Sequence, residues 1–406
     1  MSKVFLDYRK NTETTWGCLK SLEARSVINK SKTMEKLFDY KERTEDRYAR
    51  HLEKTYNFYD STAKPEFVAV REMLNDWFSR YPETDKRQLK GDFRSSQFES
   101  AFFELFIHEL FFQQGFTLTP HPTVPNSTKN PDFLAKKGNL EFYLEAKVAT
   151  DKNNEERTLE NKLGAIYEAL QKLFSPNYWI DILDINFKTN KQAKLSKVKA
   201  QIQIWLTECH LKEEPIYNDH SDSGRECFTY DDNDVTISLR LFPSTIEKDH
   251  PIASYLGGGY SGGCEEALAK AVMEKGTRYG QLNKPYIVCI NLPGLRYPHT
   301  NEIYKTLFGR RQLTLESYIL DTAPFSTEMD GILKNSNGPA FTQVSAFFIT
   351  RVFESNLRVA DHWMIKHPAA KNRINLGMLD LSYDEMDSTQ INAIKKKSIY
   401  EILLPV

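Results

Sequence analysis

The chain has 406 residues, of which 40% are hydrophobic, 12% are aromatic and 27% are charged, and its formal net charge is −1. The apolar fraction excludes a largely disordered chain, because it is enough to build the core of one large domain or of two or three domains. The balanced charge excludes a strong overall field, so any contact with a polyanion has to come from local patches.

Residues 1–90 are predicted to form a helical N-terminal region. The segment YKERTEDRYARHLEKTY is highly charged and is typical of a solvated helix. The segment PEFVAVREMLNDWFSRYP follows, with apolar residues at helical spacing and Pro82 near its end. A helical cap packed on the main domain explains this region at least as well as any functional role.

The next predicted helix lies in SSQFESAFFELFIHELFFQQGF, residues 95–116. Ser95 or Ser96 is a suitable N-cap residue, and Gly115 is a suitable C-terminal stop. The helix between them is apolar on most of its circumference, so we expect it to be buried. The segment FTLTPHP that follows is expected to contain a short strand.

The segment NPDFLAKKGNLEFYLEAKVA, residues 130–149, predicts a β-hairpin with Gly138 and Asn139 as a two-residue turn. This register places Asp132 opposite Glu145, with their Cβ atoms about 4.5–5.5 Å apart. Because side chains alternate along a strand, Lys147 shares the face of Glu145. The opposite face is apolar and suited to a core, with Phe133, Ala135, Phe142, Leu144, Ala146 and Val148.

Two directly opposed carboxylates are destabilising unless a cation neutralises them. Lys147 is one such cation, and a divalent metal is a stronger one. Carboxylate oxygens suit Mg²⁺, and the carbonyl of Ala146 is a further candidate ligand. A metal held in this way can polarise a phosphate oxygen and lower the pKa of a bound water. Lys147 can orient that water or stabilise charge on the phosphate.

The later segments alternate between predicted helices and strands. They are a helix in EERTLENKLGAIYEALQKLF, a strand in YWIDILDINF, a helix at about 195–209, a strand in DVTISLRLF, a helix in CEEALAKAVMEKGTRYGQL and strands in KPYIVCINLP and VSAFFITRVF. This order predicts an α/β fold, a mixed β-sheet flanked by helices.

The motif formed by Pro131-Asp132 and by Glu145-Ala146-Lys147 resembles that of the PD-(D/E)XK nucleases, the restriction-endonuclease-like superfamily. That superfamily also carries an acid on the preceding helix, and Glu104 in AFFELFIHELFFQQGF matches it. The resemblance covers residues 95–190. It implies a fold with a helix, a three-stranded meander, a helix and a further strand.

The resemblance also implies metal-dependent hydrolysis of phosphodiester bonds, with Mg²⁺ or Mn²⁺ as the cofactor. Asp132 and Glu145 would hold the metal, Lys147 would assist the attacking water, and Glu104 would complete the acidic site. We therefore assign residues 91–295 to a nuclease-like domain and residues 296–406 to an α+β C-terminal region. Two alternatives stay open: a surface ion-pair cluster, and a nuclease-like scaffold that binds nucleic acid without cutting it.

His108 lies one helical turn after Glu104 and is a candidate to support the metal site from behind or to contact the substrate. A partly buried histidine with a structural role is the alternative. Glu99 and Glu109 are alternative acids on the same helix, although their flanking residues match the superfamily pattern less well. His121 lies where the first strand turns toward the hairpin. We interpret it as a turn residue, and an approach to the acidic site is the alternative.

Candidate nucleic-acid contacts are lysines. Lys162, on the helix after the hairpin, is one candidate for a phosphate contact. The segment KTNKQAKLSKVK, residues 188–199, carries five lysines and no acid, among them Lys191, Lys194 and Lys197. Such a cluster attracts a phosphate backbone without regard to sequence, and a solvated loop is an equally good interpretation.

The glycine-rich segment GGGYSGG, residues 257–263, formally contains G-x-G-x-x-G. No convincing strand precedes it and no acidic partner for a ribose is evident, which argues against a dinucleotide site.

The five cysteines are scattered and include no C-x-x-C pair, which argues against a disulfide framework or a zinc knuckle. The sequence MSKVFLDYRK lacks the apolar segment of a signal peptide, and no apolar run approaches the ~20 residues that span a bilayer. We therefore expect a cytoplasmic protein without a membrane partner. Its expected partners are nucleic acid, DNA rather than RNA, and a second copy of the chain or another protein of a bacterial restriction or anti-phage defence system.

Overall fold

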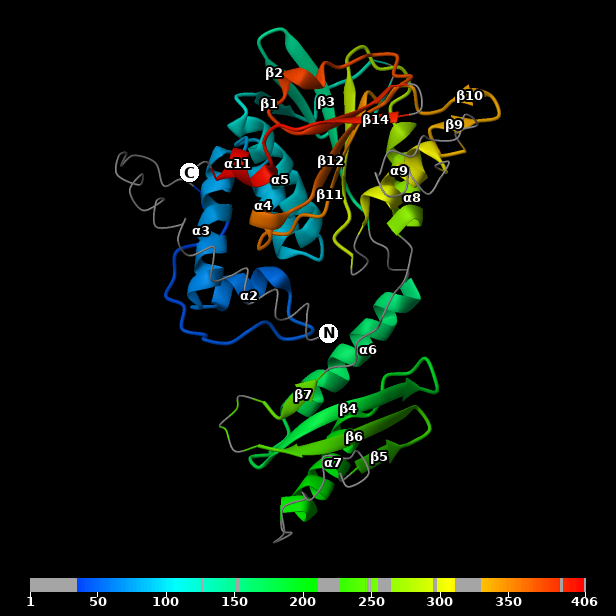
Figure 1. The fold of residues 1–406 in the computed structure, drawn as a ribbon. Helices are drawn as coiled ribbons and strands as arrows, with labels where there is room; N and C mark the ends of the chain where they lie inside the picture. The colour runs from blue at the N-terminus through cyan, green and yellow to red at the C-terminus, as the bar shows by residue number, and fades with distance from the viewer. Residues whose placement is uncertain are drawn as a thin grey trace. The chain divides into compact units, whose positions relative to one another are not determined.

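The structure is a computed structural model, shown as a ribbon in Figure 1. It describes residues 35–125, 127–149, 154–210, 227–244, 246, 248, 250–254, 264–294, 298–310, 330–387 and 390–404. The glycine-rich segment at 257–263 lies outside these residues. Among them, no helix is long and apolar enough to cross a membrane.

The chain divides into two compact units. The main unit consists of Met1–Tyr48, Lys54–Asp151 and Tyr260–Val406, and the inserted unit consists of Ala49–Glu53 and Lys152–Gly259. The boundaries predicted at residues 90 and 295 both fall inside the main unit. The reason is that strands from residues 117–148, 286–291 and 346–394 join one sheet.

The main unit contains an eight-stranded sheet with the order β1-β2-β3-β8-β11-β12-β13-β14. Strand β3 is antiparallel to β2 and parallel to β8, so the sheet is mixed. The predicted mixed sheet flanked by helices is therefore confirmed. Its strands are β1 (Thr117–Pro120), β2 (Phe133–Lys137), β3 (Leu140–Val148), β8 (Tyr286–Asn291), β11 (Ala346–Thr350), β12 (His362–Lys366), β13 (Tyr383–Asp387) and β14 (Gln390–Ile394).

Helices cover both faces of this sheet (Figure 1). On one face, α5 (Phe98–Gln113) packs against β1 and β3, and three helices pack against α5: α3 (Pro65–Arg80), α4 (Lys86–Arg94) and α11 (Ile399–Leu403). Helix α2 (Thr55–Ser61) packs against α3 and α4, and all five helices contribute to the core on this face. The other face packs against α8 (Cys264–Gly276) and α9 (Thr300–Phe308). The remaining elements of the unit are the short pair β9 (Lys334–Asn335) and β10 (Gly338–Pro339), and the 3₁₀ turns η3 (Leu357–Val359) and η4 (Leu376–Met378).

Side-chain alternation explains how one sheet serves two cores. In β8, Ile287 and Cys289 belong to the core under α5, whereas Tyr286, Val288 and Ile290 belong to the core under α8. A strand buried on both faces has an unbroken apolar run, as in YIVCI.

The hairpin register is confirmed. Lys137 pairs with Leu140 and Leu134 pairs with Tyr143, so the turn is Gly138-Asn139. Gly138 has φ 58°, a left-handed conformation that glycine adopts without steric cost. The face predicted to be apolar does enter the core beneath α5.

The ends of α5 are predicted only in part. Gly115 follows the helix with φ 83°, as expected of a C-terminal glycine. The predicted N-cap is wrong, because Gln97 precedes the helix and Ser95 instead closes α4. The helix predicted in YKERTEDRYARHLEKTY, residues 40–56, is wrong for residues 40–54, which contain no helix, and α2 begins at Thr55.

The inserted unit has its own four-stranded sheet, in the order β5-β6-β4-β7. The strand predicted in YWIDILDINF is its strand β4, so it does not follow β3 in the main sheet as the resemblance implied. The position beside β3 belongs to β8, because the inserted unit interrupts the chain between β3 and α8. Its elements are α6 (Asn154–Gln171), β4 (Tyr178–Phe187), α7 (Leu195–His210), β5 (Cys227–Asp231), β6 (Val235–Pro243) and β7 (Ile252–Ser254).

Candidate active site

The predicted acids meet at one end of the hairpin in the main unit. Asp132 immediately precedes β2, and its Oδ2 accepts a hydrogen bond of 2.6 Å from the amide of Ala146. The last pair of the β2–β3 ladder is Phe133 with Leu144, so Asp132 and Glu145 each lie next to the end of this ladder. The charge of Glu145 raises the pKa of Asp132, so the two carboxylates lie near each other.

Glu145 is almost fully buried, with 1% of its surface exposed. Its carboxylate accepts a hydrogen bond of 2.5 Å from the ammonium of Lys275, at the end of α8. The hydroxyl of Tyr279 donates to its second oxygen, and Nε of Arg278 lies 3.5 Å from its first. A buried carboxylate is tolerated when cations and hydrogen bonds surround it in this way.

Glu104 lies on α5 and accepts a hydrogen bond of 2.5 Å from the hydroxyl of Tyr81, which follows α3. Burial raises the pKa of Glu104, and the hydrogen bond from Tyr81 opposes this. Burial also raises the pKa of the Tyr81 hydroxyl, so this group stays a donor.

Asp132 carries the clearest electrostatic signature of the site. Burial raises its pKa to about 8, and the carboxylates of Glu145 and Glu104 add to the increase. The amide of Ala146 and the ammonium of Lys275 act in the opposite direction. The three acids therefore share one buried neighbourhood, in which burial and the two nearby carboxylates disfavour the charged form of Asp132.

Lys147 lies on the same face of β3 as Glu145, as predicted, and pairs with Glu274 of α8. Its ammonium lies 2.8 Å from Oε2 and 3.1 Å from Oε1 of that residue. The hydrogen bond from Lys147 lowers the pKa of Glu274. The side chain of Lys147 is 30% exposed, so it meets solvent beside the buried acids.

The carbonyl of Ala146 is placed where a ligand can reach it. The amides of Tyr143 and Ala149 donate to Pro285 and Asn291, on the β8 side of β3. Backbone groups alternate along a strand, so Ala146 faces the β2 side. The last β2–β3 pair is Phe133 with Leu144, so the Ala146 carbonyl lies beyond that ladder.

His108 is buried behind the site. Its ring packs 5.0 Å from the ring of Tyr81, centroid to centroid, and it also contacts Phe112 and Phe133. Burial lowers its pKa to about 4, so the ring is neutral at physiological pH. His108 thus touches the residue that holds Glu104.

The alternative acids of α5 have other environments. Glu109 is fully buried and pairs with Arg80 at 2.7 Å, and Glu99 is exposed. His121 turns the chain with φ 47°, and its amide donates a hydrogen bond of 3.0 Å to the backbone carbonyl of Asp132.

The sequence interpretation missed the contribution of α8 and its C-terminal extension. The segment CEEALAKAVMEKGTRYGQL was recognised as a helix, but Glu274, Lys275 and Tyr279 were not predicted to face the acids. The sequence signal is the pair of charged residues Glu274 and Lys275, which come at the end of a helix with an apolar face. These charges can be assigned to the acidic site only when β8 is known to pair with β3, because this pairing places α8 over the hairpin.

The predicted nucleic-acid contacts lie in the inserted unit. Lys162 is largely buried, donates a hydrogen bond of 3.2 Å to the carbonyl of Thr189 and lies over the ring of Phe187. Lys191 and Lys194 are exposed. Lys197 is also exposed, with its ammonium 5.9 Å from the centre of the Tyr230 ring.

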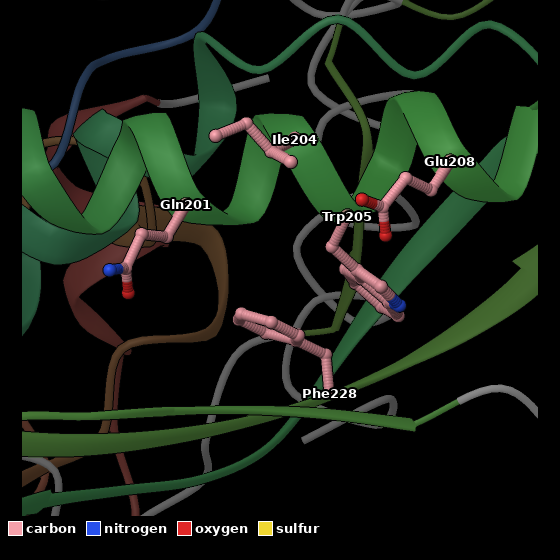
Figure 2. A pocket seen from close by; sticks show the side chains of 5 residues that line it. All are labelled: Gln201, Ile204, Trp205, Glu208 and Phe228. Carbon is pink, nitrogen blue, oxygen red and sulfur yellow. The ribbon is translucent and has the colours of Figure 1, made fainter.

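The inserted unit also carries a groove of about 350 Å³ between α7 and β5 (Figure 2). The rings of Trp205 and Phe228 stack in it, with centroids 4.9 Å apart. The sequence did not predict this groove. Its other lining residues are Gln201, Ile204 and Glu208.

A second group of possible metal ligands occurs among the described residues of the main unit. One ligand atom each of Cys264, Glu265 and Glu302 lies within 4.8 Å of the others. Glu302 also accepts a hydrogen bond from the amide of His299 and so caps α9, which is a structural role.

The hairpin acids suit a hard divalent cation. Carboxylate oxygens and a backbone carbonyl are the ligands that Mg²⁺ and Mn²⁺ prefer. Burial and the neighbouring carboxylates raise the pKa of Asp132, and a bound cation would favour its charged form. Comparisons of the chain with protein-family models, with curated proteins and with solved structures found no match.

Proposed function

We propose that this protein is a metal-dependent nuclease with a restriction-endonuclease-like core. The observation that carries the proposal is the buried acidic cluster: burial, Glu145 and Glu104 raise the pKa of Asp132, and Lys147 lies on the same face of β3 as Glu145. Perturbed carboxylates next to a partly exposed lysine are typical of a catalytic site.

The topology of the main unit supports the proposal. Helix α5, the meander β1-β2-β3, helix α8 and strand β8 follow the order that the superfamily resemblance implies. Strand β8 is parallel to β3, and α8 crosses over between them. The inserted unit lengthens the connection between β3 and α8 without entering this sheet.

The residues have distinct roles in the proposed reaction. Asp132, Glu145 and the Ala146 carbonyl would hold Mg²⁺ or Mn²⁺, which supplies polarisation of the phosphate and a more acidic bound water. Lys147 orients the attacking water with its ammonium, and Glu104 adds negative charge from α5. Water attacks phosphorus, one ester bond breaks, and the products are a phosphate monoester, a free hydroxyl and a proton.

We propose DNA as the substrate and bacterial restriction or anti-phage defence in the cytoplasm as the context. The exposed lysines of the inserted unit, Lys191, Lys194 and Lys197, support a polyanionic substrate. A second copy of the chain or another defence protein is the protein partner that this context suggests.

A non-catalytic scaffold is the second candidate, and one specific observation favours it. Glu145 is already neutralised by Lys275, and Lys147 by Glu274. A module that only binds nucleic acid needs no more than such an internally paired cluster.

The two candidates are separated by a cleavage assay on supercoiled plasmid, linear duplex, single-stranded DNA and RNA, with Mg²⁺, Mn²⁺ or EDTA. The variants are Asp132→Asn and Lys147→Met, and Glu99→Gln is the control because Glu99 is exposed on the same helix as Glu104. We expect metal-dependent cutting of DNA that falls at least about 100-fold in both site variants and persists in the control. Equal cutting by wild type and Asp132→Asn, or binding without cutting under every condition, would favour the scaffold.

A further inference from the structure

Lys275 is a buried lysine whose ammonium forms an ion pair with Glu145 in the candidate active site. It lies 2.5 Å from Oε1 of Glu145 and donates a hydrogen bond to it. Only 7% of Lys275 is exposed. A lysine this buried is stable only while its charge is paired, so Glu145 and Lys275 depend on each other.

Lys275 also influences the other metal-candidate acid. Its charge lowers the pKa of Asp132, against the larger effects of burial and of Glu145. The ammonium therefore supplies part of the positive charge that a divalent cation would supply to the same two carboxylates.

Lys275 and a divalent cation compete for this position. A carboxylate oxygen that accepts a short, charge-assisted hydrogen bond offers less electron density to a metal. An ammonium ion that stays beside a divalent cation also suffers like-charge repulsion, which is strong in a buried site. Metal binding to Glu145 therefore requires that the ammonium of Lys275 move away.

We propose that Lys275 is a built-in counter-cation that holds Glu145 in the free protein and is displaced from it when a divalent cation binds. The proposal rests on the proposed function, because it assumes that Asp132 and Glu145 bind metal. Lys275 is a positioning residue in this account, since it acts through Glu145.

The neighbours of Lys275 show where its charge can go. Glu274, the preceding residue of α8, is 41% exposed and already holds the ammonium of Lys147. Arg278 lies one turn further along the chain, beside Glu145. A released Lys275 would join Lys147 and Arg278 at the site and add positive charge for an incoming phosphate.

The first test measures Mn²⁺ affinity of the full chain by calorimetry, independently of cleavage. Lys275→Met removes the charge, Lys275→Arg keeps it, and Lys270→Met is the control because Lys270 is exposed on the same helix. We expect Lys275→Met to bind Mn²⁺ at least about tenfold more tightly than wild type, and the other two variants to match wild type. Unchanged or weaker binding by a folded Lys275→Met would overturn the proposal.

The second test uses the wild-type protein, because Lys275→Met leaves Glu145 without its cation and can unfold the chain. Lysines are acetylated with a trace of acetic anhydride, and the modified peptides are quantified by mass spectrometry with and without Mn²⁺. We expect Mn²⁺ to raise the labelling rate of Lys275 severalfold and to leave that of Lys270 unchanged. Equal labelling of Lys275 at saturating Mn²⁺ would contradict displacement.

The two tests separate this inference from the proposed function. If wild type binds Mn²⁺ and cuts DNA, but neither Lys275 readout changes, only the counter-cation proposal fails. If neither wild type nor Lys275→Met binds Mn²⁺, the nuclease proposal fails, and the counter-cation proposal fails with it.

Discussion

At the scale of single residues, the protein places three carboxylates in one buried neighbourhood and leaves one of them with a strongly altered pKa. Burial, Glu145 and Glu104 together raise the pKa of Asp132 to about 8, against an ordinary value of 3.8. Natural proteins retain such destabilising arrangements mainly where function requires them.

The raised pKa of Asp132 predicts how stability depends on pH without metal. Between pH 4 and 8 the folded state keeps a proton that the unfolded state has released, so the free energy of unfolding falls as pH rises. Asp132→Asn cannot ionise and keeps an oxygen to accept the amide of Ala146. We expect urea denaturation to show that this variant gains roughly 2 kcal/mol over wild type between pH 6 and pH 8.

Saturating Mg²⁺ or Mn²⁺ should reduce this difference, because the metal stabilises only the wild-type carboxylate. A wild type whose stability relative to Asp132→Asn is the same at pH 6 and pH 8 would show that Asp132 ionises normally.

At the scale of elements, the site depends on how the C-terminal end of α8 is held against the hairpin. Gly276 follows Lys275 directly, and a Cβ atom there would lie 2.6 Å from Cδ1 of Phe341. This close approach fixes the end of α8, from which Lys275 reaches Glu145.

Gly276→Ala should therefore shift this end of the helix and disturb the site. We expect it to lower the free energy of unfolding by about 1–3 kcal/mol, as overpacking does, and to reduce cleavage. Gly91→Ala is the matched control, because no atom lies within 4 Å of an added Cβ at Gly91 in α4. That substitution should be neutral or stabilising by up to about 1 kcal/mol. Thermal unfolding of both variants checks the prediction, and equal effects would contradict it.

Prediction from the sequence succeeded where the determinants are local. The turn at Gly138-Asn139 and the alternation on either side set the hairpin register, so the pairs from Lys137 with Leu140 to Phe133 with Leu144 followed directly. The helical spacing of AFFELF placed Glu104 on a buried helix just before the hairpin. Each of these features depends on interactions between nearby segments of the chain.

Prediction failed where a partner is remote in the sequence. Strand β8 pairs with β3 but follows the inserted unit in the sequence. The segment YWIDILDINF comes earlier in the chain, and its apolar pattern suits the position beside β3 equally well. Because of that error, α8 was not placed over the hairpin, and Glu274, Lys275 and Tyr279 were missed. The charged segment at residues 40–56 was predicted as helix from its composition, whereas residues 35–54 contain no helix and α2 begins only at Thr55.

At the scale of the whole molecule, the chain separates the acidic site from the candidate nucleic-acid contacts. The acids of the candidate active site and the lysines and arginine paired with them belong to the main unit. Lys191, Lys194 and Lys197 belong to the inserted unit. Each unit has its own core, so a change on the surface of the inserted unit should leave the metal site intact.

Replacing Lys191, Lys194 and Lys197 together by Ala tests this separation. We expect the triple variant to bind duplex DNA more weakly. We also expect its affinity to depend less on salt: the slope of log K against log[salt] should become smaller in magnitude by up to about 0.9 for each phosphate that is no longer neutralised. Mn²⁺ affinity should not change. The control replaces Lys270, Lys371 and Lys395, which are exposed in the main unit, and so removes the same charge. An equal weakening of DNA binding in both triple variants would indicate a general charge effect.

Calorimetric titration of Mn²⁺ at pH 7 tests whether Asp132, Glu145 and Glu104 form a divalent-metal site. Wild type should bind Mn²⁺ with release of protons, because the metal displaces the proton that the raised pKa of Asp132 retains. Asp132→Asn should lose this binding, and Cys264→Ser should keep it, since Cys264 belongs to the other ligand group. Binding that survives in Asp132→Asn, or is lost only in Cys264→Ser, would contradict the account.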